Sequence, residues 1–579
     1  MSRNDEVADL LEEFADLLEA QDVEYKPRAY RDAAENIREL SVAIEGLAAD
    51  GQEAVAGIDG VGDAISAKIV EYFETGEIEE LEQLRAELPV EMDALTRVEG
   101  VGPKTVGTLY EELGIQTLDD LEEAAEAGEI RELYGFGAKT EQNILGGLDF
   151  AREAHERQLL ARALPRADRV LDFLTRVDAV EHVELAGSIR RRKPTVGDVD
   201  VLVSSADSEA VVGAFTDWKA PERVIEAGTG KASVRLEDVR VDLRVVDPAE
   251  FGAALQYFTG SKSHNVAVRN RAIERDLKVN EYGVFDVSGI EDPDAGQRVG
   301  ERVAGPEEEG VYDALDMAWV PPELREDRGE VAAAAAGALP DLVAHEEVRG
   351  DLHVHTTWSD GAASIAEMVE AAAAVGHEYV AITDHATGPG MVGGVGLDDA
   401  ELREQLPAIR EVGDDADIEV LAGVEANIGT DGEISVGDDV LADLDVVVAS
   451  PHAGLDGDGT DRLVAAAEHP EVDIVGHPTG RQLNRRPGMT VDVEQLARRV
   501  AEHDTALEIN AHPRRLDLRG RAVQTAIEAG ATVAIDTDAH APGDYEHIRY
   551  GVDTARRGWA EADDILNTRS VDAVLAALE

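Results

Sequence analysis

The sequence of 579 residues contains no cysteine, so disulfide bonds and thiolate metal ligands are excluded. Any metal ion must therefore bind to histidine, aspartate or glutamate. The sequence also has no apolar run near the roughly 20 residues that a transmembrane helix needs. The N-terminus, MSRNDEVADLLEEF, is charged from its start and lacks the apolar core of a signal peptide. We therefore expect a cytoplasmic protein that does not bind membranes.

Lysine is scarce, since only nine of the 53 basic residues are lysines, and 122 acidic residues give a formal net charge of -69. Such a charge argues against nucleic-acid binding, which usually depends on basic residues that release counterions from phosphate. However, the acidic excess runs along the whole chain, as we expect for a cytosol that holds molar salt. At 1 M ionic strength the Debye length is about 3 Å, so short-range contacts would decide DNA binding. The basic cluster at residues 190–193 argues against the alternative, an acidic protein that avoids nucleic acid.

Residues 185–203, LAGSIRRRKPTVGDVDVLV, are the most informative stretch. Side chains two positions apart in a β-strand point the same way, so Asp198 and Asp200 share one face while the intervening valines enter the core. Gly187 has no side chain, so the backbone of the preceding turn can approach a triphosphate closely. The candidate phosphate contacts in this turn are Gly187, Ser188 and Arg191.

A second predicted strand, residues 239–246 (VRVDLRVV), places Arg240, Asp242 and Arg244 on one face. Three aspartates on adjacent strands suit two Mg²⁺ ions roughly 3.5 to 4 Å apart, which stabilise the attacking and leaving oxygens in phosphoryl transfer. The alternative is that paired aspartates lie by chance on an exposed edge strand of a very acidic protein. The apolar flanks, the Gly-Ser turn and the second strand together favour a nucleotidyltransferase site.

These motifs resemble the DNA polymerase X family, in which GS(x)RR, DxD and RxDxR mark the catalytic palm. The resemblance continues through residues 257–272, YFTGSKSHNVAVRNRA, and residues 278–285, KVNEYGVF. It implies that Asp198, Asp200 and Asp242 are catalytic and hold two Mg²⁺ ions. It also implies contacts to the incoming nucleotide and to DNA: Tyr257, Phe258 and Gly260 at the sugar, Asn265 at the base edge, Arg269 at the template strand and Arg240 at DNA.

Three glycine turns punctuate the first 150 residues, at 57–69 (GIDGVGDAISAKI), 97–110 (RVEGVGPKTVGTLY) and 133–144 (LYGFGAKTEQNI). Each predicts a turn that opens a helix and directs backbone N–H groups at a phosphate. One such turn is often only a tight turn, but three resemble helix-hairpin-helix elements that bind the DNA backbone. The candidate DNA contacts are Lys26, Gly60, Gly62, Gly100, Gly102, Lys104, Gly135 and Gly137.

The first hairpin, with residues 29–37 (AYRDAAENI), resembles the lyase subdomain of the same family. Lys68 matches the lysine that forms a Schiff base with abasic deoxyribose phosphate, a reaction that needs an amine able to lose its proton near neutral pH. Relatives with strong lyase activity usually have another lysine four residues earlier, where this chain has Ala64. The alternative is that Lys68, together with Lys26, binds a DNA 5′-phosphate.

In the carboxy-terminal half, an alanine-rich stretch at residues 331–338 predicts a short connecting helix or linker. From residue 348 onward, short β-branched runs alternate with amphipathic segments, which indicates βα units around a parallel sheet or barrel. Histidines and carboxylates follow these strands, and carboxy-terminal strand ends meet at the mouth of a barrel. The candidate metal ligands are His353, His355, Asp360, His385, Glu425, His452, His477, Asp538 and His540, a donor set that suits Zn²⁺, Mn²⁺ or Fe²⁺.

Five further histidines read as surface or core residues: His377, His469, His503, His512 and His547. His512 is the doubtful one, because Arg514 and Arg515 beside it could contact a substrate phosphate.

This half resembles the PHP (polymerase and histidinol phosphatase) domain, a distorted seven-fold β/α barrel with a trinuclear centre of Zn²⁺ or Mn²⁺. The resemblance implies three ligand groups: His353, His355, Glu425 and Asp538; then Asp360, His385 and His540; then Glu425, His452 and His477. Some PHP domains attached to polymerases have lost ligands. Here every position is filled, which favours catalysis.

We therefore predict a multidomain α/β chain of the halophilic archaeal X-family type. Its parts are a lyase-like helix-hairpin-helix subdomain (1–90), a second helix-hairpin-helix subdomain (91–155), an α+β nucleotidyltransferase palm (156–247), a nucleotide-selecting thumb (248–325), a linker (326–347) and a distorted (β/α)₇ PHP barrel (348–579). We expect a monomer that fills gaps in gapped or primer-template DNA from dNTPs, with 3′–5′ exonuclease or 3′-end phosphoesterase activity. The alternatives are a metal-dependent DNA phosphoesterase whose first half only delivers DNA, and a non-catalytic scaffold that binds DNA ends.

Overall fold

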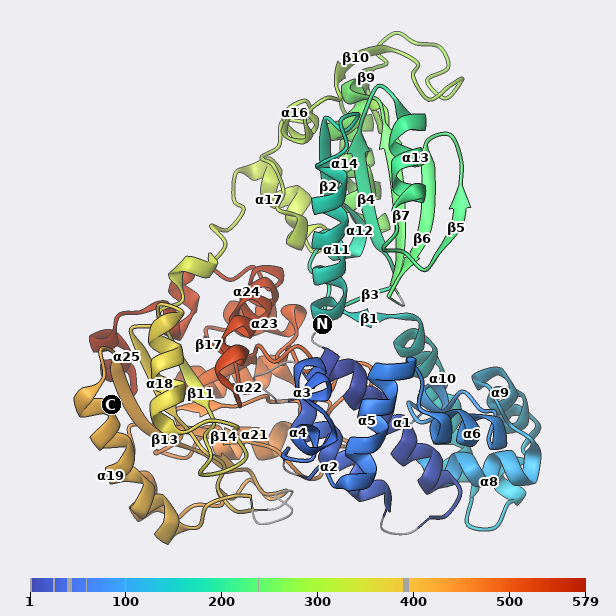
Figure 1. Ribbon diagram of the computed structural model, residues 1–579. Coiled ribbons are helices and arrows are strands. Elements are labelled where there is room, and N and C mark those ends of the chain that lie inside the picture. The colour runs from blue at the N-terminus through green and yellow to red at the C-terminus, as the bar shows by residue number, and fades with distance from the viewer. Residues whose placement is uncertain are drawn as a thin grey trace.

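A computed structural model describes residues 3–23, 26–38, 44–58, 60–98, 100–237, 239–388 and 395–578. The chain forms a helical region, a palm with a central sheet, a thumb with a smaller sheet, and a large α/β barrel (Figure 1). Among the described helices, none is both long and apolar enough to cross a bilayer.

The helical region is held together by apolar side chains at helical spacing. In α1, Val7, Leu11, Phe14 and Leu18 are buried, and Phe14 stacks on Tyr30 of α2 with ring centroids 4.4 Å apart. The described helices here are α1 (Arg3–Ala20), α2 (Lys26–Arg38), α3 (Ile44–Asp50), α4 (Gln52–Val55), α5 (Asp63–Thr75), α6 (Glu79–Glu87), α7 (Met92–Leu95), α8 (Pro103–Leu113), α9 (Leu118–Ala127), η1 (Ile130–Glu132) and α10 (Ala138–Glu156).

The palm is a sheet whose described strands lie in the order β2-β4-β7-β6-β5. Strand β7 alternates as the sequence predicts, with its apolar residues in the core and Arg240, Asp242 and Arg244 on the other face. The elements are β1 (Gln158–Leu159), α11 (Leu160–Leu174), β2 (His182–Leu185), α12 (Gly187–Arg190), β3 (Thr195–Val196), β4 (Val199–Ser204), α13 (Ser208–Asp217), β5 (Arg223–Ala227), β6 (Lys231–Leu236) and β7 (Val239–Val246).

The thumb follows and includes much of the predicted linker. Glu330 is buried and lies 2.6 Å from Nδ1 of His264, and Ala334 packs into the thumb core. Helix α17 is therefore part of the thumb, because this buried pair fixes its first residue there. The elements are η2 (Pro248–Glu250), α14 (Phe251–Thr259), α15 (Lys262–Ile273), β8 (Leu277–Asn280), β9 (Gly283–Asp286), β10 (Glu301–Ala304), α16 (Glu308–Asp313), η3 (Pro322–Leu324) and α17 (Glu330–Ala336).

The barrel contains seven parallel strands in sequential order, counted over the residues that the structure describes. A parallel bridge between Val354 and Ala539 brings β11 against β17 and nearly closes the ring. The predicted distorted (β/α)₇ fold is thus confirmed, and β15 is its shortest strand. The strands are β11 (Gly350–Val354), β12 (Tyr379–Ile382), β13 (Glu419–Asn427), β14 (Val446–Ser450), β15 (Ile474–Val475), β16 (Ala506–Asn510) and β17 (Thr532–Asp536).

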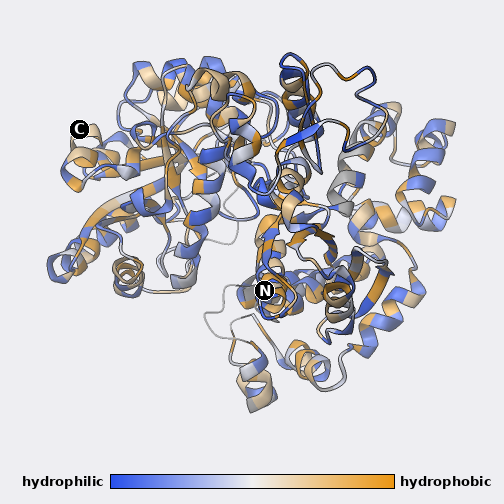
Figure 2. Cartoon of the chain, turned by 90° about the horizontal axis from the view of Figure 1, so that it is seen from above, coloured by the Kyte–Doolittle hydropathy of each residue, from blue (hydrophilic) through white to orange (hydrophobic). Residues whose placement is uncertain are grey.

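Helices surround these strands. In Figure 2 the strands are coloured mainly as hydrophobic residues, whereas the helices outside them carry both hydrophobic and hydrophilic residues. They are η4 (His345–Glu347), α18 (Ile365–Ala374), α19 (Asp399–Asp415), α20 (Asp438–Leu441), α21 (Thr460–Ala467), α22 (Val493–Glu502), α23 (Gly520–Glu528), η5 (Pro542–His547), α24 (Ile548–Arg557), η6 (Ala562–Asp564), η7 (Leu566–Thr568) and α25 (Val571–Leu578).

The barrel is packed against the rest of the chain. Leu516 and Tyr550 of the barrel are buried in the apolar core of the palm. Asn484, in the loop after β15, accepts a hydrogen bond from Arg97 of the helical region at 3.1 Å and donates one to Arg157 O at 2.7 Å. These contacts join distant parts of the sequence into one assembly.

Candidate functional site

The three palm aspartates converge at one end of the sheet. Strands β4 and β7 are parallel neighbours, and their register places Asp200 directly opposite Asp242. Asp198 immediately precedes β4, and one carboxylate oxygen from each of the three residues lies within 4.8 Å of the others. This spacing fits shared divalent cations, because carboxylates suit Mg²⁺.

Burial raises the pKa of Asp200 to about 7, and the negative charges of Asp198 and Asp242 act in the same direction. Burial and the charge of Asp242 likewise raise the pKa of Asp198. Three carboxylates held this close repel one another, so bound cations would stabilise the arrangement. The donor set and the spacing therefore fit the two Mg²⁺ ions of the sequence prediction.

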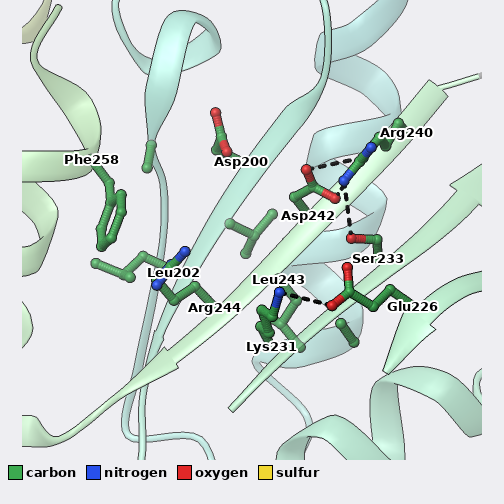
Figure 3. Close-up of a pocket in the computed structure, with 13 residues that line it drawn as sticks. Asp200, Leu202, Glu226, Lys231, Ser233, Arg240, Asp242, Leu243, Arg244 and Phe258 are labelled. Atoms are coloured by element: carbon green, nitrogen blue, oxygen red, sulfur yellow. Dashed lines mark hydrogen bonds and ion pairs between the residues drawn. The ribbon is translucent and has the colours of Figure 1, made fainter. Parts of the chain in front are cut away.

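A cavity of about 190 Å³ opens beside these acids, lined by both basic and aromatic side chains. Figure 3 shows Asp200 and Asp242 on adjacent strands, with Arg240 bonded to Asp242. The Arg240 Nε lies 2.9 and 3.0 Å from the two oxygens of Asp242. Arg244 lies over the ring of Phe258, with its guanidinium carbon 4.4 Å from the ring centroid. The cavity thus combines cationic, aromatic and acidic groups.

The turn before β4 requires glycine at position 187. Gly187 has φ of +59°, and a Cβ there would lie 1.9 Å from Oδ2 of Asp200. In this turn Ser188 is half-buried, and Arg191 is buried near enough to Asp200 that its positive charge acts to lower the pKa of that carboxyl. The Arg191 Nε donates to Glu326 at 2.9 Å and its Nη1 to the Thr259 carbonyl at 2.7 Å. Two of its N–H donors are thereby fixed on the thumb side.

The predicted nucleotide contacts of the thumb cluster at the end of α14. Tyr257 and Phe258 pack edge to face at 5.2 Å. Asn265 donates through Nδ2 to the Tyr257 carbonyl at 2.7 Å and accepts from Gln256 at 3.1 Å. A Cβ at Gly260 would lie 2.4 Å from Oδ1 of Asn265, so Asn265 closes this turn. Arg269 lies exposed on α15.

The three predicted hairpins form glycine turns before α5, α8 and α10. The first glycine of each turn, Gly60, Gly100 and Gly135, has positive φ, and the second, Gly62, Gly102 and Gly137, is the N-cap of the helix. Lys26 is exposed at the start of α2, and exposed Lys104 lies 3.1 Å from Asp22. The turns thus have the backbone geometry that the sequence predicts, and their DNA contacts stay predictions.

Lys68 is held by acidic and aromatic neighbours. Its Nζ lies 2.8 Å from Glu80 and 5.5 Å from the centroid of the Phe14 ring. Burial works to lower the pKa of Lys68, but the hydrogen bond to Glu80 and the effect of Tyr30 outweigh it, so the pKa is raised. This environment keeps the amine protonated at neutral pH, which opposes Schiff-base formation.

The second cluster lies at the carboxy-terminal ends of the barrel strands, and the structure brings all nine predicted ligands together there. Glu425 on β13 is its centre. Its oxygens lie 3.4 Å from His353, 3.7 Å from His355, 2.5 Å from His385, 3.4 Å from His452 and 2.9 Å from His477. The single buried carboxylate of Glu425 therefore contacts the rings of five histidines.

Two further aspartates extend this cluster. Asp538 lies 3.1 Å from Nε2 of His355 and 3.7 Å from Nδ1 of His540. Asp360 lies 3.5 Å from His385 and 3.4 Å from His540. Three donor groups can each hold one ion: His355, Asp360, His385 and His540; His353, His355 and Glu425; and His385, Glu425 and His452. They overlap the predicted groups, with His355, His385 and Glu425 each shared between two, whereas the predicted ligands Asp538 and His477 belong to none of the three.

Buried atoms without partners show that these residues fit metal ions. Nε2 of His353, Nδ1 of His355 and Nε2 of His452 are buried and have no hydrogen-bond partner among the residues that the structure describes. A buried imidazole nitrogen normally has a partner, so these atoms are suited to ligation. Burial lowers the pKa of His355 to about 4 and that of His477 to about 3, which leaves both rings neutral as ligands must be. For His353, His385 and His540, burial works to lower the pKa but the neighbouring carboxylates outweigh it and raise the pKa, so metal binding would release protons from these rings.

Sequence reasoning missed the side chains that orient the ligands. Glu508 lies 2.6 Å from Nδ1 of His353, Asn427 lies 2.7 Å from Nδ1 of His452, and Asn510 donates to Asp538 at 3.0 Å. Each contact fixes which atom of the ligand faces the cluster. The sequence does carry one signal for Glu508, because this acidic residue lies within the apolar run that forms the fully buried strand β16.

The doubtful His512 accepts a hydrogen bond from the Arg514 backbone at 3.3 Å, and it packs against His547. Arg515 lies 3.5 Å from Asp538, so it borders the cluster. Its role in binding phosphate stays a prediction. His377 packs against Tyr545, and His503 is exposed.

Comparison with known proteins assigns the parts of the chain. Residues 2–78 match a helix-hairpin-helix domain, 92–149 a SAM-like helix-hairpin-helix tandem, 254–326 the DNA polymerase beta thumb and 351–512 the PHP domain. The chain is also similar to a probable phosphatase from Caldanaerobacter subterraneus, with 32% identity over 204 residues, 33% of this chain and 75% of that protein.

Two polymerases are similar over longer stretches. DNA polymerase lambda from Rattus norvegicus is 25% identical over 300 residues, 48% of each chain. The DNA polymerase/3′-5′ exonuclease PolX of Bacillus subtilis (strain 168) is 35% identical over 578 residues, which cover 98% of both chains. With this identity over nearly its whole length, the chain belongs to the DNA polymerase X family.

Proposed function

We propose that this protein is a template-directed DNA repair polymerase that fills short gaps, and that its PHP barrel is a metal-dependent 3′–5′ exonuclease or 3′-end phosphoesterase. The observation that carries the proposal is the register of the palm sheet. Asp200 lies opposite Asp242 on parallel strands, with Asp198 within reach of both. A family relative that spans the whole chain is a polymerase and exonuclease by name, which supports both activities.

In the palm, Asp198 and Asp200 hold the cations, and Asp242 faces the primer 3′-hydroxyl and activates it for in-line attack on the α-phosphate. Two Mg²⁺ ions, when bound there, would stabilise the attacking and leaving oxygens. Ser188 and Arg191 receive the pyrophosphate. The remaining N–H donors of Arg191 can do so, because in the described contacts Glu326 and Thr259 engage one hydrogen of Nε and one of Nη1, which leaves Nη2 and the second hydrogen of Nη1.

The thumb supplies the nucleotide contacts. Tyr257, Phe258 and Gly260 contact the sugar, and Asn265 reaches the base edge. Hydrogen bonds to the Tyr257 carbonyl and from Gln256 hold the Asn265 amide in place, which supports a fixed wall beside the nucleotide. Arg240 and Arg269, both exposed, contact DNA. The three glycine hairpins bind the DNA backbone.

In the barrel, the nine candidate ligands would hold the metal ions to which the scissile phosphate group binds. Up to three Zn²⁺ or Mn²⁺ ions, when bound, would supply Lewis acidity toward that phosphate. The buried Nε2 of His353 and Nδ1 of His355, which make no hydrogen bond to the described residues, support this role. The similarity to a probable phosphatase over 204 residues supports removal of a 3′-phosphate as well as of nucleotides.

The composition supports function in molar salt. A net charge of -69 would repel DNA at low ionic strength, and screening shortens that repulsion to about 3 Å at 1 M. We therefore propose that the protein acts in the cytoplasm of a salt-accumulating cell, and we propose separately that it is a monomer. DNA binding should then rise between low and molar KCl, the opposite of the usual dependence.

One end-labelled gapped duplex tests the proposal. The full chain is incubated with this duplex in low and molar KCl, with Mg²⁺ and with Mn²⁺, with and without dNTPs. We expect extension by one nucleotide per template base when dNTPs are present, and shortening from the 3′ end when they are absent. Duplexes ending in a 3′-phosphate or carrying an abasic site separate exonuclease, phosphatase and endonuclease activity. No extension under any condition would leave a DNA phosphoesterase, and no turnover at all would leave a scaffold.

A further inference from the structure

Arg557, the last residue of α24 in the barrel, extends into the palm turn that carries Arg191. Its side chain is almost fully buried, with 6% relative exposure for the residue. The Nη1 of Arg557 donates to the backbone carbonyl of Arg191, and its Nη2 lies 3.4 Å from Oε1 of Glu326. The two arginines are 366 positions apart in the sequence. Helix α24 therefore links the barrel directly to the palm, the two domains that carry the candidate active sites.

The same oxygen of Glu326 joins both arginines. Oε1 accepts from Nε of Arg191 at 2.9 Å and faces Arg557 at 3.4 Å. The Glu326 side chain is 16% exposed, so water screens these charges weakly. Charge-assisted hydrogen bonds in such an environment hold side chains in one geometry, and the planar guanidinium group makes that geometry specific.

Arg557 thereby fixes Arg191 at two points. Directly, it binds the backbone carbonyl of Arg191. Indirectly, it holds Glu326, which binds the side chain of Arg191. The Thr259 carbonyl supplies the third contact. Without Arg557, Glu326 would lose a positive neighbour and the turn would lose a backbone contact, so Arg191 would sample orientations that point away from the nucleotide.

We propose that Arg557 is a positioning residue for nucleotidyl transfer, through which the PHP barrel orients Arg191 toward the triphosphate of the incoming nucleotide. The proposal rests on the polymerase function proposed above and deepens it. It assigns the barrel a part in nucleotide binding by the palm that is separate from its own hydrolytic chemistry.

Arg556, which precedes Arg557 on α24, is a matched control for the loss of an arginine at this interface. Arg556 also crosses from the barrel to the thumb, where its Nε donates to Glu323 at 2.8 Å, and its Nη1 donates to the Val343 carbonyl at 3.0 Å. It therefore contributes to domain packing without touching Arg191 or Glu326 in the described contacts. Comparison of R557M with R556M separates positioning of Arg191 from packing of α24.

The experiment measures single-nucleotide gap filling by the full chain as a function of dNTP concentration. We expect R557M to raise KM for dNTP about tenfold, the loss expected for one charge-assisted hydrogen bond, with kcat changed less than about twofold. R557K should recover part of this loss, and R556M should keep the wild-type KM. Exonuclease rates of all variants on a single-stranded 3′ end should match the wild type.

A double variant shows whether Arg557 acts through Glu326. If it does, R557M with E326Q should raise KM by less than the product of the two single effects. An unchanged KM in R557M would overturn the inference while leaving the proposed function intact. Equal changes in R557M and R556M, or loss of exonuclease activity in step with synthesis, would reduce Arg557 to a packing residue. Absence of synthesis by the wild-type chain would instead overturn the proposed polymerase function, and the inference with it.

Discussion

Oε1 of Glu508 lies 2.6 Å from Nδ1 of His353, and Oε2 of the same residue accepts a hydrogen bond from the backbone N–H of His477. One carboxylate on β16 thus orients two candidate ligands from different strands. Because Nδ1 of His353 donates to Glu508, its Nε2 faces Glu425 at 3.4 Å and Asp538 at 3.8 Å. The tautomer and the ring orientation of His353 are both set by this contact.

Replacing Glu508 with glutamine should weaken metal binding in the barrel about 10- to 100-fold, because the ligand ring loses its charged acceptor. Competition for Zn²⁺ with a chelator of known affinity measures this directly, without any activity assay. Glu404→Gln, on the exposed surface of α19, should bind Zn²⁺ as the wild type does. Equal affinities of the two variants would contradict the role of Glu508.

Gly187→Ala should reduce nucleotide incorporation at least about tenfold and leave the exonuclease unchanged. The added Cβ would lie 1.9 Å from Oδ2 of Asp200, at a backbone φ of +59° that non-glycine residues rarely adopt. Gly197→Ala is the control, since nothing lies within 4 Å of a Cβ at that position just before Asp198. Steady-state incorporation by both variants gives the comparison, and similar losses would show that the turn is merely fragile.

Sequence patterns predict those features that local geometry decides. Period-two alternation places Asp242 on the outer face of β7, and the ends of the strands and the loops after them bring nine candidate ligands together at the barrel mouth. Contacts between distant segments leave no such periodic signal. Glu326 lies 135 positions from Arg191, and Glu508 lies 155 positions from His353. Neither partnership could be predicted without the fold.

The alanine-rich helix α17 shows the same limit. Its composition predicts a short connecting helix or linker, and residues 330–336 do form a helix, but the buried pair of Glu330 with His264 makes that helix part of the thumb. Similarly, the amine of Lys68 reads as a candidate nucleophile in the sequence, whereas its pairing with Glu80 depends on the packing of α5 against α6.

Lys68 should form a Schiff base with abasic deoxyribose phosphate only weakly at neutral pH. Its pKa is raised, so the amine is protonated at pH 7 and the reactive neutral fraction grows as the pH rises. Borohydride trapping on a 5′-abasic gapped duplex should therefore increase from pH 7 to pH 9. Glu80→Gln should increase trapping at pH 7, because it removes the contact that stabilises the ammonium form.

Lys68→Ala should abolish trapping, and Lys219→Ala, on the exposed palm surface, should leave it unchanged. Trapping that persists in the Lys68 variant would show that another amine reacts. Loss of duplex binding in the same variant, with no trapping in the wild type, would favour the phosphate-binding role.

Glu308 should stabilise the palm and thumb in a pH-dependent way. It accepts hydrogen bonds from Arg190 at 2.7 Å and from Arg325 at 2.6 Å. Burial works to raise the pKa of Glu308, but Arg325 and Arg190 outweigh it and lower the pKa to about 2. The stabilisation is complete above the unfolded-state pKa of about 4.5 and is lost as the pH falls toward 2.

Glu308→Gln should therefore reduce the free energy of unfolding by about 3 kcal/mol at pH 7 and by clearly less at pH 3. Urea unfolding of both proteins at the two pH values measures the difference. An equal loss at pH 7 and pH 3 would mean that the charge of Glu308 contributes little.

We propose that this one chain carries two independent sites, one that joins nucleotides and one that removes them. The most direct measurement compares two double variants, Asp198→Ala with Asp200→Ala and His353→Ala with His355→Ala, on the same end-labelled gapped duplex. We predict that the palm variant loses synthesis and keeps 3′-end shortening, while the barrel variant does the reverse. If either variant lost both activities to the same extent, the assignment of one reaction to each site would be contradicted.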